Sequence, residues 1–347
     1  MRNSILFFGP IFVKKYPLIL SILLFSFIQS IWANMSPQAR IINGNTTTEA
    51  QIPWHVALIT SPLDPYQSYI CSGSLVADRW VVTAAHCIEP LEKQNSDYYI
   101  LIGAQNLQSI QLGQIIKVKK GHMHEKYNNR IYDNDLALLE LESAVDFIKC
   151  GKNCQTIDII NPTLEKQNAL IASMTQIAGW GVLENCDNSQ SLVCQHYAGQ
   201  MMRNPALYPT TLRYTTLKLA NCLSSSSLYS AQQITQNMLC AESPMQDSLT
   251  DACYGDSGAG LTINNLEKPY LLGIASWGVG CAKVGYPGVY TRVTNYSDWI
   301  NNYLHPSTIP EQKTSQTNQS GGGSVSIVML LMLLGLSLIR WRTIKDE

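Results

Sequence analysis

The sequence has little charge and almost no imbalance of charge. Only 14% of its residues are charged, and 24 Lys and Arg stand against 25 Asp and Glu, which leaves a net charge of −1. This balance excludes a generally basic nucleic-acid binder and an acidic disordered chain. Paired Cys-x-x-Cys metal ligands are also missing, although the chain has 10 cysteines. An even number of cysteines without that spacing is typical of an exported, disulfide-bonded protein.

The first of two apolar runs lies at the N-terminus of the 347-residue chain. It extends from Leu18 to Ile28, follows Lys14 and Lys15, and precedes the small residue Ala33. A basic start, a short apolar run and a small residue at the cut are the parts of a secretory signal. We therefore expect a signal peptide over residues 1–33. An uncleaved membrane anchor is the alternative, but the run is short for a full span.

The second apolar run lies at the C-terminus. A polar and glycine-rich linker, residues 305–324, leads to an apolar segment at 325–339 and a basic tail that ends at 347. The order of triple glycine (321–323), apolar helix and basic tail resembles the bacterial GlyGly-CTERM sorting signal. That resemblance implies cleavage near the glycines by a rhomboid-type membrane protease. A membrane anchor through residues 325–339 is the rival interpretation, and the basic tail favours a cytoplasmic C-terminus.

Between the two ends, short strands dominate. Apolar runs at Tyr98–Ile102, Ile115–Val118 and Leu136–Leu139 are separated by Gly, Asn and Asp turns, which predicts an all-β sandwich or barrel. One helix is expected at Tyr296–Leu304, where apolar residues recur every three or four positions, and Thr294 or Asn295 is a candidate cap.

Three segments offer the groups that nucleophilic catalysis needs. A serine hydroxyl requires an adjacent base and an orienting acid. Ser257 stands in Gly-Asp-Ser-Gly, His86 in Thr-Ala-Ala-His-Cys, and Asp135 directly before the apolar strand at 136–139. Glycines around the serine let the backbone bend and let a carbonyl approach, and the N–H groups of Gly255 and Ser257 can face a developing oxyanion. Asp133 is rejected as the acid because it does not adjoin that strand.

These segments, in the order His, Asp, Ser, resemble the trypsin-like serine proteases of the chymotrypsin fold. The resemblance covers residues 41–304 and includes Pro53-Trp54, Gly-Trp-Gly at 179–181, Ser-Trp-Gly at 276–278 and Pro-Gly-Val-Tyr at 287–290. It implies two six-stranded antiparallel β-barrels, with the active site between them and a short C-terminal helix. The boundary between the barrels along the chain is expected at about residues 150–165. The resemblance also implies that Ser257 is the nucleophile, His86 the general base and acid, and Asp135 the group that orients His86.

The same resemblance implies a substrate pocket. Asp251, six residues before Ser257, matches the acid at the bottom of the primary pocket, and Ser276, Gly278 and Gly288 match its walls. A buried carboxylate there pairs with a cation, so we expect cleavage after Arg or Lys. Ala252 stands where many relatives have serine. Because Lys gains more than Arg from that extra acceptor, Arg should be preferred.

An activation site is expected at Arg40-Ile41, which resembles the junction of the family's zymogens. Residues 34–40 would then be the propeptide, and the freed Ile41 amine would pair with Asp256. Arg40 suits the enzyme's own predicted specificity, so self-activation is an option. Asn43 replaces the usual glycine of the junction.

The resemblance pairs Cys71 with Cys87, Cys222 with Cys240, and Cys253 with Cys281. The remaining four cysteines allow three connectivities, of which the local pairs Cys150–Cys154 and Cys186–Cys194 are favoured over zinc binding. His122-x-His124 lacks further ligands and is interpreted as a packed or solvated pair. No metal or cofactor is expected, and the stretch that matches the family's calcium loop, 104–114, contains no glutamate.

The sequence thus predicts an exported serine endopeptidase, secreted or tethered to the cell surface, that acts on proteins or peptides. The region after Gly181, through about Asn204, is longer than usual for the family and is expected to be a surface loop. The alternative function is a catalytically silent binding module with the same fold. An esterase is disfavoured because it would carry Gly-x-Ser-x-Gly and the order Ser, Asp, His.

Overall fold

The computed structural model describes residues 44–111, 113–169, 171–184, 202–245, 250–265 and 268–306. They all belong to a compact unit that ends at Pro306. The predicted signal peptide, propeptide, linker and C-terminal apolar segment lie outside the described residues, as does the Arg40-Ile41 junction.

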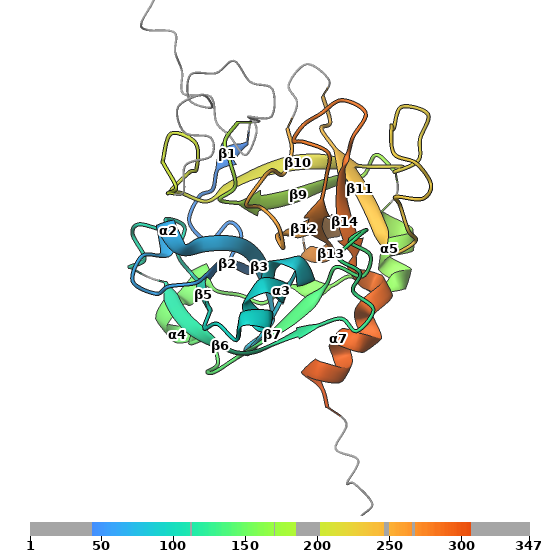
Figure 1. Ribbon diagram of the computed structural model, residues 1–347. Coiled ribbons are helices and arrows are strands. Elements are labelled where there is room, and N and C mark those ends of the chain that lie inside the picture. Colours follow the sequence, from blue (N-terminus) through green and yellow to red (C-terminus); the bar gives the residue numbers. More distant parts are fainter. Residues whose placement is uncertain are drawn as a thin grey trace, which may run out of the picture. The chain divides into compact units, whose positions relative to one another are not determined.

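Six antiparallel strands close the first barrel, in the order β2-β3-β4-β7-β6-β5 (Figure 1). They are β2 (His55–Ile59), β3 (Tyr69–Ala77), β4 (Trp80–Thr83), β5 (Tyr99–Ile102), β6 (Gln114–Met123) and β7 (Ala137–Leu141). The strands form because short β-branched and aromatic runs can bury side chains inside a closed sheet that has no free edge. All five residues of β2 are buried, and they pair with β3 on one side and with β5 on the other.

The second barrel is also closed by six antiparallel strands. They are β9 (Met174–Gly179), β10 (Arg213–Ala220), β11 (Met238–Glu242), β12 (Gly260–Asn265), β13 (Lys268–Trp277) and β14 (Gly288–Arg292). Pairing of β9 with both β10 and β12 completes the ring. Two short strands attach to it: β1 (Asn45–Thr46) to β10 and β8 (Asp158–Ile159), in parallel, to β13. The predicted pair of six-stranded antiparallel barrels is therefore confirmed.

Short helices connect and cover the barrels. They are α2 (Pro65–Ser68), α3 (Ala85–Gln94), α4 (Phe147–Cys150), α5 (Pro162–Asn168) and α7 (Ser297–Leu304), with 3₁₀ turns at Gly151–Asn153 and Val293–Tyr296. The predicted C-terminal helix is present as α7, but its start was predicted wrongly. A 3₁₀ turn precedes it and no side chain caps it, because Thr294 donates its hydroxyl to Glu165 and Asn295 its amide to the Gln236 carbonyl.

Four disulfides join described residues: Cys71–Cys87, Cys150–Cys154, Cys222–Cys240 and Cys253–Cys281. Cys186 and Cys194 lie outside the described residues. These bonds fit an extracellular protein, because disulfides persist where the surroundings are oxidising. No helix within the described ranges is both long and apolar enough to cross a membrane.

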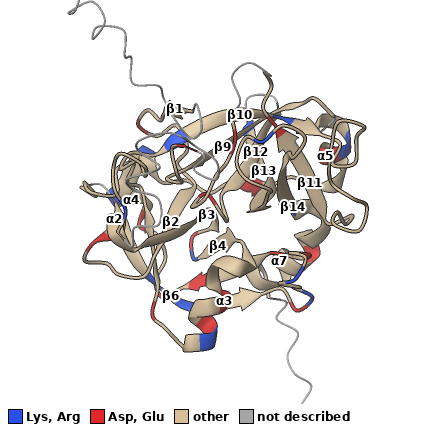
Figure 2. Ribbon diagram, turned by 45° about the horizontal axis from the view of Figure 1, so that its top comes forward, with Lys and Arg blue, Asp and Glu red and all other residues tan. Residues whose placement is uncertain are grey.

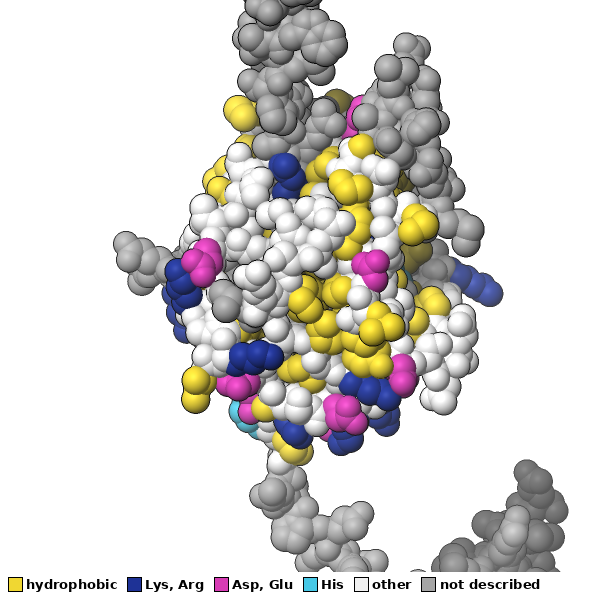
Figure 3. Space-filling view, turned by 90° about the vertical axis from the view of Figure 1, so that its left-hand side faces the viewer, with side chains coloured by type: hydrophobic (Ala, Val, Ile, Leu, Met, Phe, Trp, Pro, Cys, Tyr) yellow, Lys and Arg dark blue, Asp and Glu magenta, His cyan; other side chains and the backbone are white. Residues whose placement is uncertain are grey.

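Charged residues of both signs are scattered over the described ribbon (Figure 2). The side that faces left in Figure 1 shows hydrophobic side chains across its middle and charged ones of both signs near its lower edge (Figure 3). Apolar surface of this kind is ordinary for a globular protein.

Candidate active site

Both barrels line a cavity of about 330 Å³ that gathers most of the predicted site. His86 is the second residue of α3, directly after β4 of the first barrel. Ser257 lies in the loop between β11 and β12 of the second. The other predicted residues that line the cavity are Asp251, Asp256, Ser276, Gly278 and Gly288. Residues far apart in the sequence thus converge at one hollow between the barrels.

Asp135 fixes the position and the tautomer of His86. Its Oδ2 lies 2.7 Å from His86 Nδ1, and its Oδ1 accepts the His86 backbone N–H at 3.0 Å. Since an ionised carboxylate only accepts hydrogen bonds, Nδ1 carries the proton and Nε2 is left with a lone pair.

Two hydroxyl groups of the second barrel also hold Asp135. Asp135 is fully buried. The Ser276 hydroxyl donates to its Oδ2 at 2.5 Å, and the Thr291 hydroxyl donates to its backbone carbonyl at 2.8 Å. Asp135 of the first barrel is therefore held by two hydroxyls of the second, one from β13 on its carboxylate and one from β14 on its backbone carbonyl, and these bonds link the two barrels at the site.

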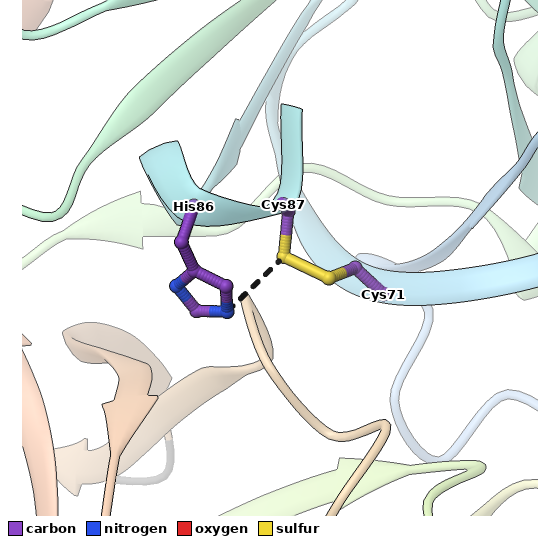
Figure 4. A group of neighbouring side chains, drawn as sticks. All are labelled: Cys71, His86 and Cys87. Carbon is purple, nitrogen blue, oxygen red and sulfur yellow. Dashed lines mark hydrogen bonds between the residues drawn. A yellow bond between two sulfur atoms is a disulfide. The ribbon is translucent and has the colours of Figure 1, made fainter. Parts of the chain in front are cut away.

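The other ring nitrogen of His86 faces a disulfide. His86 Nε2 lies 3.8 Å from the Cys87 sulfur, which is bonded to Cys71 (Figure 4). Cys71, His86 and Cys87 gather closely enough to resemble a metal site. Because both sulfurs are joined in a disulfide, neither is a thiolate that could bind a metal ion. The bond instead fixes the segment that carries His86 to β3.

The loop around Ser257 depends on two glycines with positive φ. Gly255 has φ +98° and Gly258 has φ +79°, values that other residues rarely adopt. A methyl group on Gly258 would also overlap the Ser72 carbonyl oxygen. The backbone N–H of Ser72 in turn donates to the Ser257 carbonyl at 2.8 Å. The serine is thus held on a sharp turn that packs directly against β3.

Asp251 is a buried carboxylate with one oxygen unused. It is only 5% exposed. Its Oδ2 accepts the Ala282 N–H at 2.8 Å, whereas its Oδ1 has no hydrogen-bond partner among the described residues. Burial raises the pKa of this carboxyl to about 7. Such an oxygen is costly unless a ligand satisfies it.

Asp256 is buried beneath the Ser257 loop. Its Oδ1 accepts the Gly181 N–H at 2.8 Å and its Oδ2 accepts the Cys253 N–H at 2.9 Å. Burial raises its pKa to about 6, although these hydrogen bonds and the charge of Arg203 oppose that rise. A side chain on Gly181 would overlap the carboxylate, which explains the glycine in the Gly-Trp-Gly segment.

Several residues near the site were not predicted from the sequence to belong to it. Tyr132 lines the cavity, and its ring lies edge-on to His86 with 5.7 Å between the centroids. Asp133, rejected as the catalytic acid, accepts hydrogen bonds from Thr235 and Asn237 of the second barrel. Tyr69 donates its hydroxyl to the Gly255 carbonyl. These residues carry no motif, because each acts through a partner that is distant in sequence.

Known proteins resemble the chain over this same region. The family described as Trypsin matches residues 41–300. Trypsin Tyr p 3.0101 of Tyrophagus putrescentiae is 33% identical over 75% of the chain and 79% of its own length, and trypsin 5G1 of Aedes aegypti is 32% identical over 78% and 86%. Human tissue-type plasminogen activator is 30% identical over 78% of the chain and 46% of its own length. With its two closed barrels and the cavity between them, the chain belongs to the trypsin family and is a serine endopeptidase.

Proposed function

We propose that this endopeptidase cleaves peptide bonds after Arg, and less efficiently after Lys. The observation that carries the proposal is the unpartnered Oδ1 of Asp251, buried in the cavity that His86 and Ser257 also line. A guanidinium or ammonium group is the ligand that satisfies such an oxygen most strongly. A methyl group on Gly278 would approach only the Gly280 carbonyl oxygen, at 3.5 Å, so that wall leaves room for a long side chain.

The proposed triad is Ser257, His86 and Asp135, and the hydrogen bonds around His86 support it. With Nδ1 bonded to Asp135, Nε2 is free to take the Ser257 proton while the serine oxygen attacks the substrate carbonyl. The proton then passes from Nε2 to the leaving amine, and an acyl-enzyme remains on Ser257. Water attacks this ester, with His86 again as the base, and releases the acid product. Asp135 stays ionised and stabilises the imidazolium.

The oxyanion of each tetrahedral intermediate is assigned to the N–H groups of Gly255 and Ser257. The N–H groups that alternate with them are already used, since Asp256 donates to the Cys253 carbonyl and Gly258 to that of Ala275. Two N–H groups on one sharp turn can point to a single oxygen, and each contributes more in the transition state than in the substrate complex.

Arg is expected to be the better substrate because of Ala252. This residue lines the cavity next to Asp251, where a hydroxyl would give a lysine ammonium an extra acceptor. An arginine fork can bond Asp251 directly. Matched Arg and Lys amides should therefore differ in kcat/KM, and equal values would contradict this preference.

Activation is proposed to occur by cleavage after Arg40. The new Ile41 amine would pair with Asp256, which already carries the hydrogen bonds of the Ser257 loop. Pairing raises the pKa of an amine above its reference of about 7.7–8.0. The paired form is thus favoured below that reference and is lost as the pH rises through the raised value.

Export is proposed to follow from residues 1–33, and tethering or sorting from residues 325–347. Under this proposal the catalytic unit acts outside the cytoplasm. A rhomboid-type protease would cut near Gly321–Gly323, or the apolar segment at 325–339 would remain in the membrane. Membrane fractionation of the host, with antibodies to each end of the chain, distinguishes these two fates.

The first test uses the full chain, cut after Arg40 by immobilised trypsin that is then removed. Matched Arg, Lys and Phe amides are assayed with this sample and with Ser257→Ala treated in the same way. The identical treatment of Ser257→Ala controls for carried-over trypsin. Cleavage of Arg amides that disappears in Ser257→Ala is the expected result. No cleavage by folded, correctly cut protein would contradict the proposal and favour a binding module.

A further inference from the structure

The hydroxyl of Tyr69 forms a direct link between the barrels at the Ser257 loop. Tyr69 begins β3 of the first barrel and is 5% exposed. Its hydroxyl lies 2.6 Å from the Gly255 carbonyl oxygen, in the second barrel. Three residues further along β3, the Ser72 N–H donates to the Ser257 carbonyl at 2.8 Å. The same strand therefore holds the carbonyls of both residues whose N–H groups are assigned to the oxyanion.

The hydrogen bonds around Tyr69 can run in only one direction. A carbonyl only accepts, so Tyr69 must donate to Gly255. The Ser72 hydroxyl, 2.8 Å from the Tyr69 oxygen, must then donate to Tyr69. His55 Nε2, 3.1 Å from Ser72, is left as the donor to Ser72. Burial lowers the pKa of His55 to about 3, so His55 is neutral and carries its proton on Nε2.

Arg203 holds the ring of Tyr69. Its guanidinium lies over the Tyr69 ring at 4.7 Å from the centroid, and over the rings of Tyr66 and Tyr208 at 5.3 and 4.4 Å. It donates through Nη2 to the Trp180 carbonyl at 2.5 Å. Arg203 is half-buried, and a cation over aromatic faces that is partly shielded from water attracts them.

The backbone of Arg203 is fixed as well. Its N–H donates to the Gln67 side-chain oxygen and its carbonyl accepts the Gln67 amide, both at 2.9 Å. Gln67 belongs to α2, which directly precedes Tyr69. Arg203 and Tyr69 are thus parts of one rigid assembly that ends at the Gly255 carbonyl.

We propose that Tyr69 is a positioning residue for the oxyanion hole and that Arg203 keeps Tyr69 in place; this inference rests on the proposed function. Glycine has the least hindered backbone, so Gly255 is the residue of the loop most able to turn its N–H away. The hydrogen bond from Tyr69 fixes the following peptide plane, which contains the Gly255 carbonyl, and so limits the change in the Gly255 backbone angles by which the N–H could turn away. Burial also raises the pKa of Tyr69 well above its usual value, so the hydroxyl remains a donor throughout the working pH range.

The test separates the oxyanion hole from the substrate pocket. A peptidyl argininal forms a tetrahedral adduct with Ser257 and needs the oxyanion hole, whereas benzamidine needs only the Asp251 pocket. Loss of an oxyanion donor costs about 100-fold to 1,000-fold in kcat, and Tyr69 acts one step away. For Tyr69→Phe we therefore expect kcat for an Arg amide and argininal affinity each to fall roughly 10-fold. KM and benzamidine affinity should stay within about twofold.

Two further variants accompany Tyr69→Phe, all in the full chain cut after Arg40. Arg203→Met should lower kcat and argininal affinity in the same direction, and Arg203→Lys should restore part of the loss; this pair also serves as the test should Tyr69→Phe not fold. Tyr98→Phe is the matched control, because Tyr98 is equally buried and donates its hydroxyl to Glu92. It should leave all four quantities unchanged.

The outcomes distinguish this inference from the proposed function. An inactive wild type would refute the proposed function. An active wild type with unchanged kcat and argininal affinity in Tyr69→Phe would overturn this inference alone. Equal losses of argininal and benzamidine affinity would also overturn it, because they would show general damage to the cavity.

Discussion

At the scale of single residues, the proposed specificity makes cation binding in the pocket depend on the protonation of Asp251. Burial raises its pKa to about 7, and a bound cation favours the ionised form. Benzamidine affinity should therefore rise about tenfold per pH unit below about pH 7 and level off above it. Calorimetric titration of Ser257→Ala measures this without catalysis. Asp251→Asn is the control, and a pH slope that persists in it would refute the assignment.

Ala252 offers a second test of the pocket. Ala252→Ser adds an acceptor for a compact ammonium beside Asp251, while an arginine fork gains little. A hydrogen bond to a charged group contributes about 1.5–3 kcal/mol. The ratio of kcat/KM for Lys over Arg amides should therefore rise by about tenfold or more. An unchanged ratio would show that position 252 does not contact the substrate cation.

At the scale of elements, α7 anchors the C-terminal end of the described chain through one buried side chain. Ile300 is fully buried and belongs to the same hydrophobic cluster as the first barrel. Truncation of such a residue costs about 2–5 kcal/mol. Ile300→Ala should lower the free energy of unfolding by that amount in denaturant titration, with kcat/KM unchanged. Asn301→Ala, on the exposed side of α7, should change stability by less than about 0.5 kcal/mol.

The elements and the site residues also show how much of the structure the sequence could predict. The apolar run at Ile115–Val118 predicts a strand, but β6 continues to Met123, because its polar second half pairs with β7. Short motifs locate His86, Asp135 and Ser257. Each motif also contains the neighbouring residues that the local backbone needs, such as the glycines beside Ser257. The link from Tyr69 to Gly255 spans 186 positions, and no local pattern reports a contact of that kind. Its existence depends on how the barrels dock.

At the scale of the whole molecule, a buried neutral histidine makes stability depend on pH. His55 lies in β2, its ring 5.2 Å from that of Trp180, and burial lowers its pKa to about 3. The unfolded chain binds a proton at this residue near pH 6.5, so between about pH 6.5 and 3 it holds one more proton than the folded chain. Stability from His55 is therefore complete above that window and falls as the pH drops through it, by about 1.4 kcal/mol per unit.

His55→Gln isolates this dependence, because glutamine can still donate to Ser72 but does not titrate. The free energy of unfolding of the two proteins, measured by denaturant titration at several pH values, should diverge below about pH 6.5 in favour of the variant. Asp251 and Asp256, whose raised pKa values make stability fall with rising pH in part of the same window, are present in both proteins and cancel in the difference. Parallel curves would mean that the pKa of His55 is the same in the folded and the unfolded chain, so that His55 is protonated in the folded protein below about pH 6.5. The one-way chain of hydrogen bonds from His55 to Gly255 would survive that result, because a protonated histidine also donates from Nε2. The unfolding curves therefore test whether His55 is neutral in the folded protein. The kinetics of Tyr69→Phe test the hydrogen bond from Tyr69 to the Gly255 carbonyl.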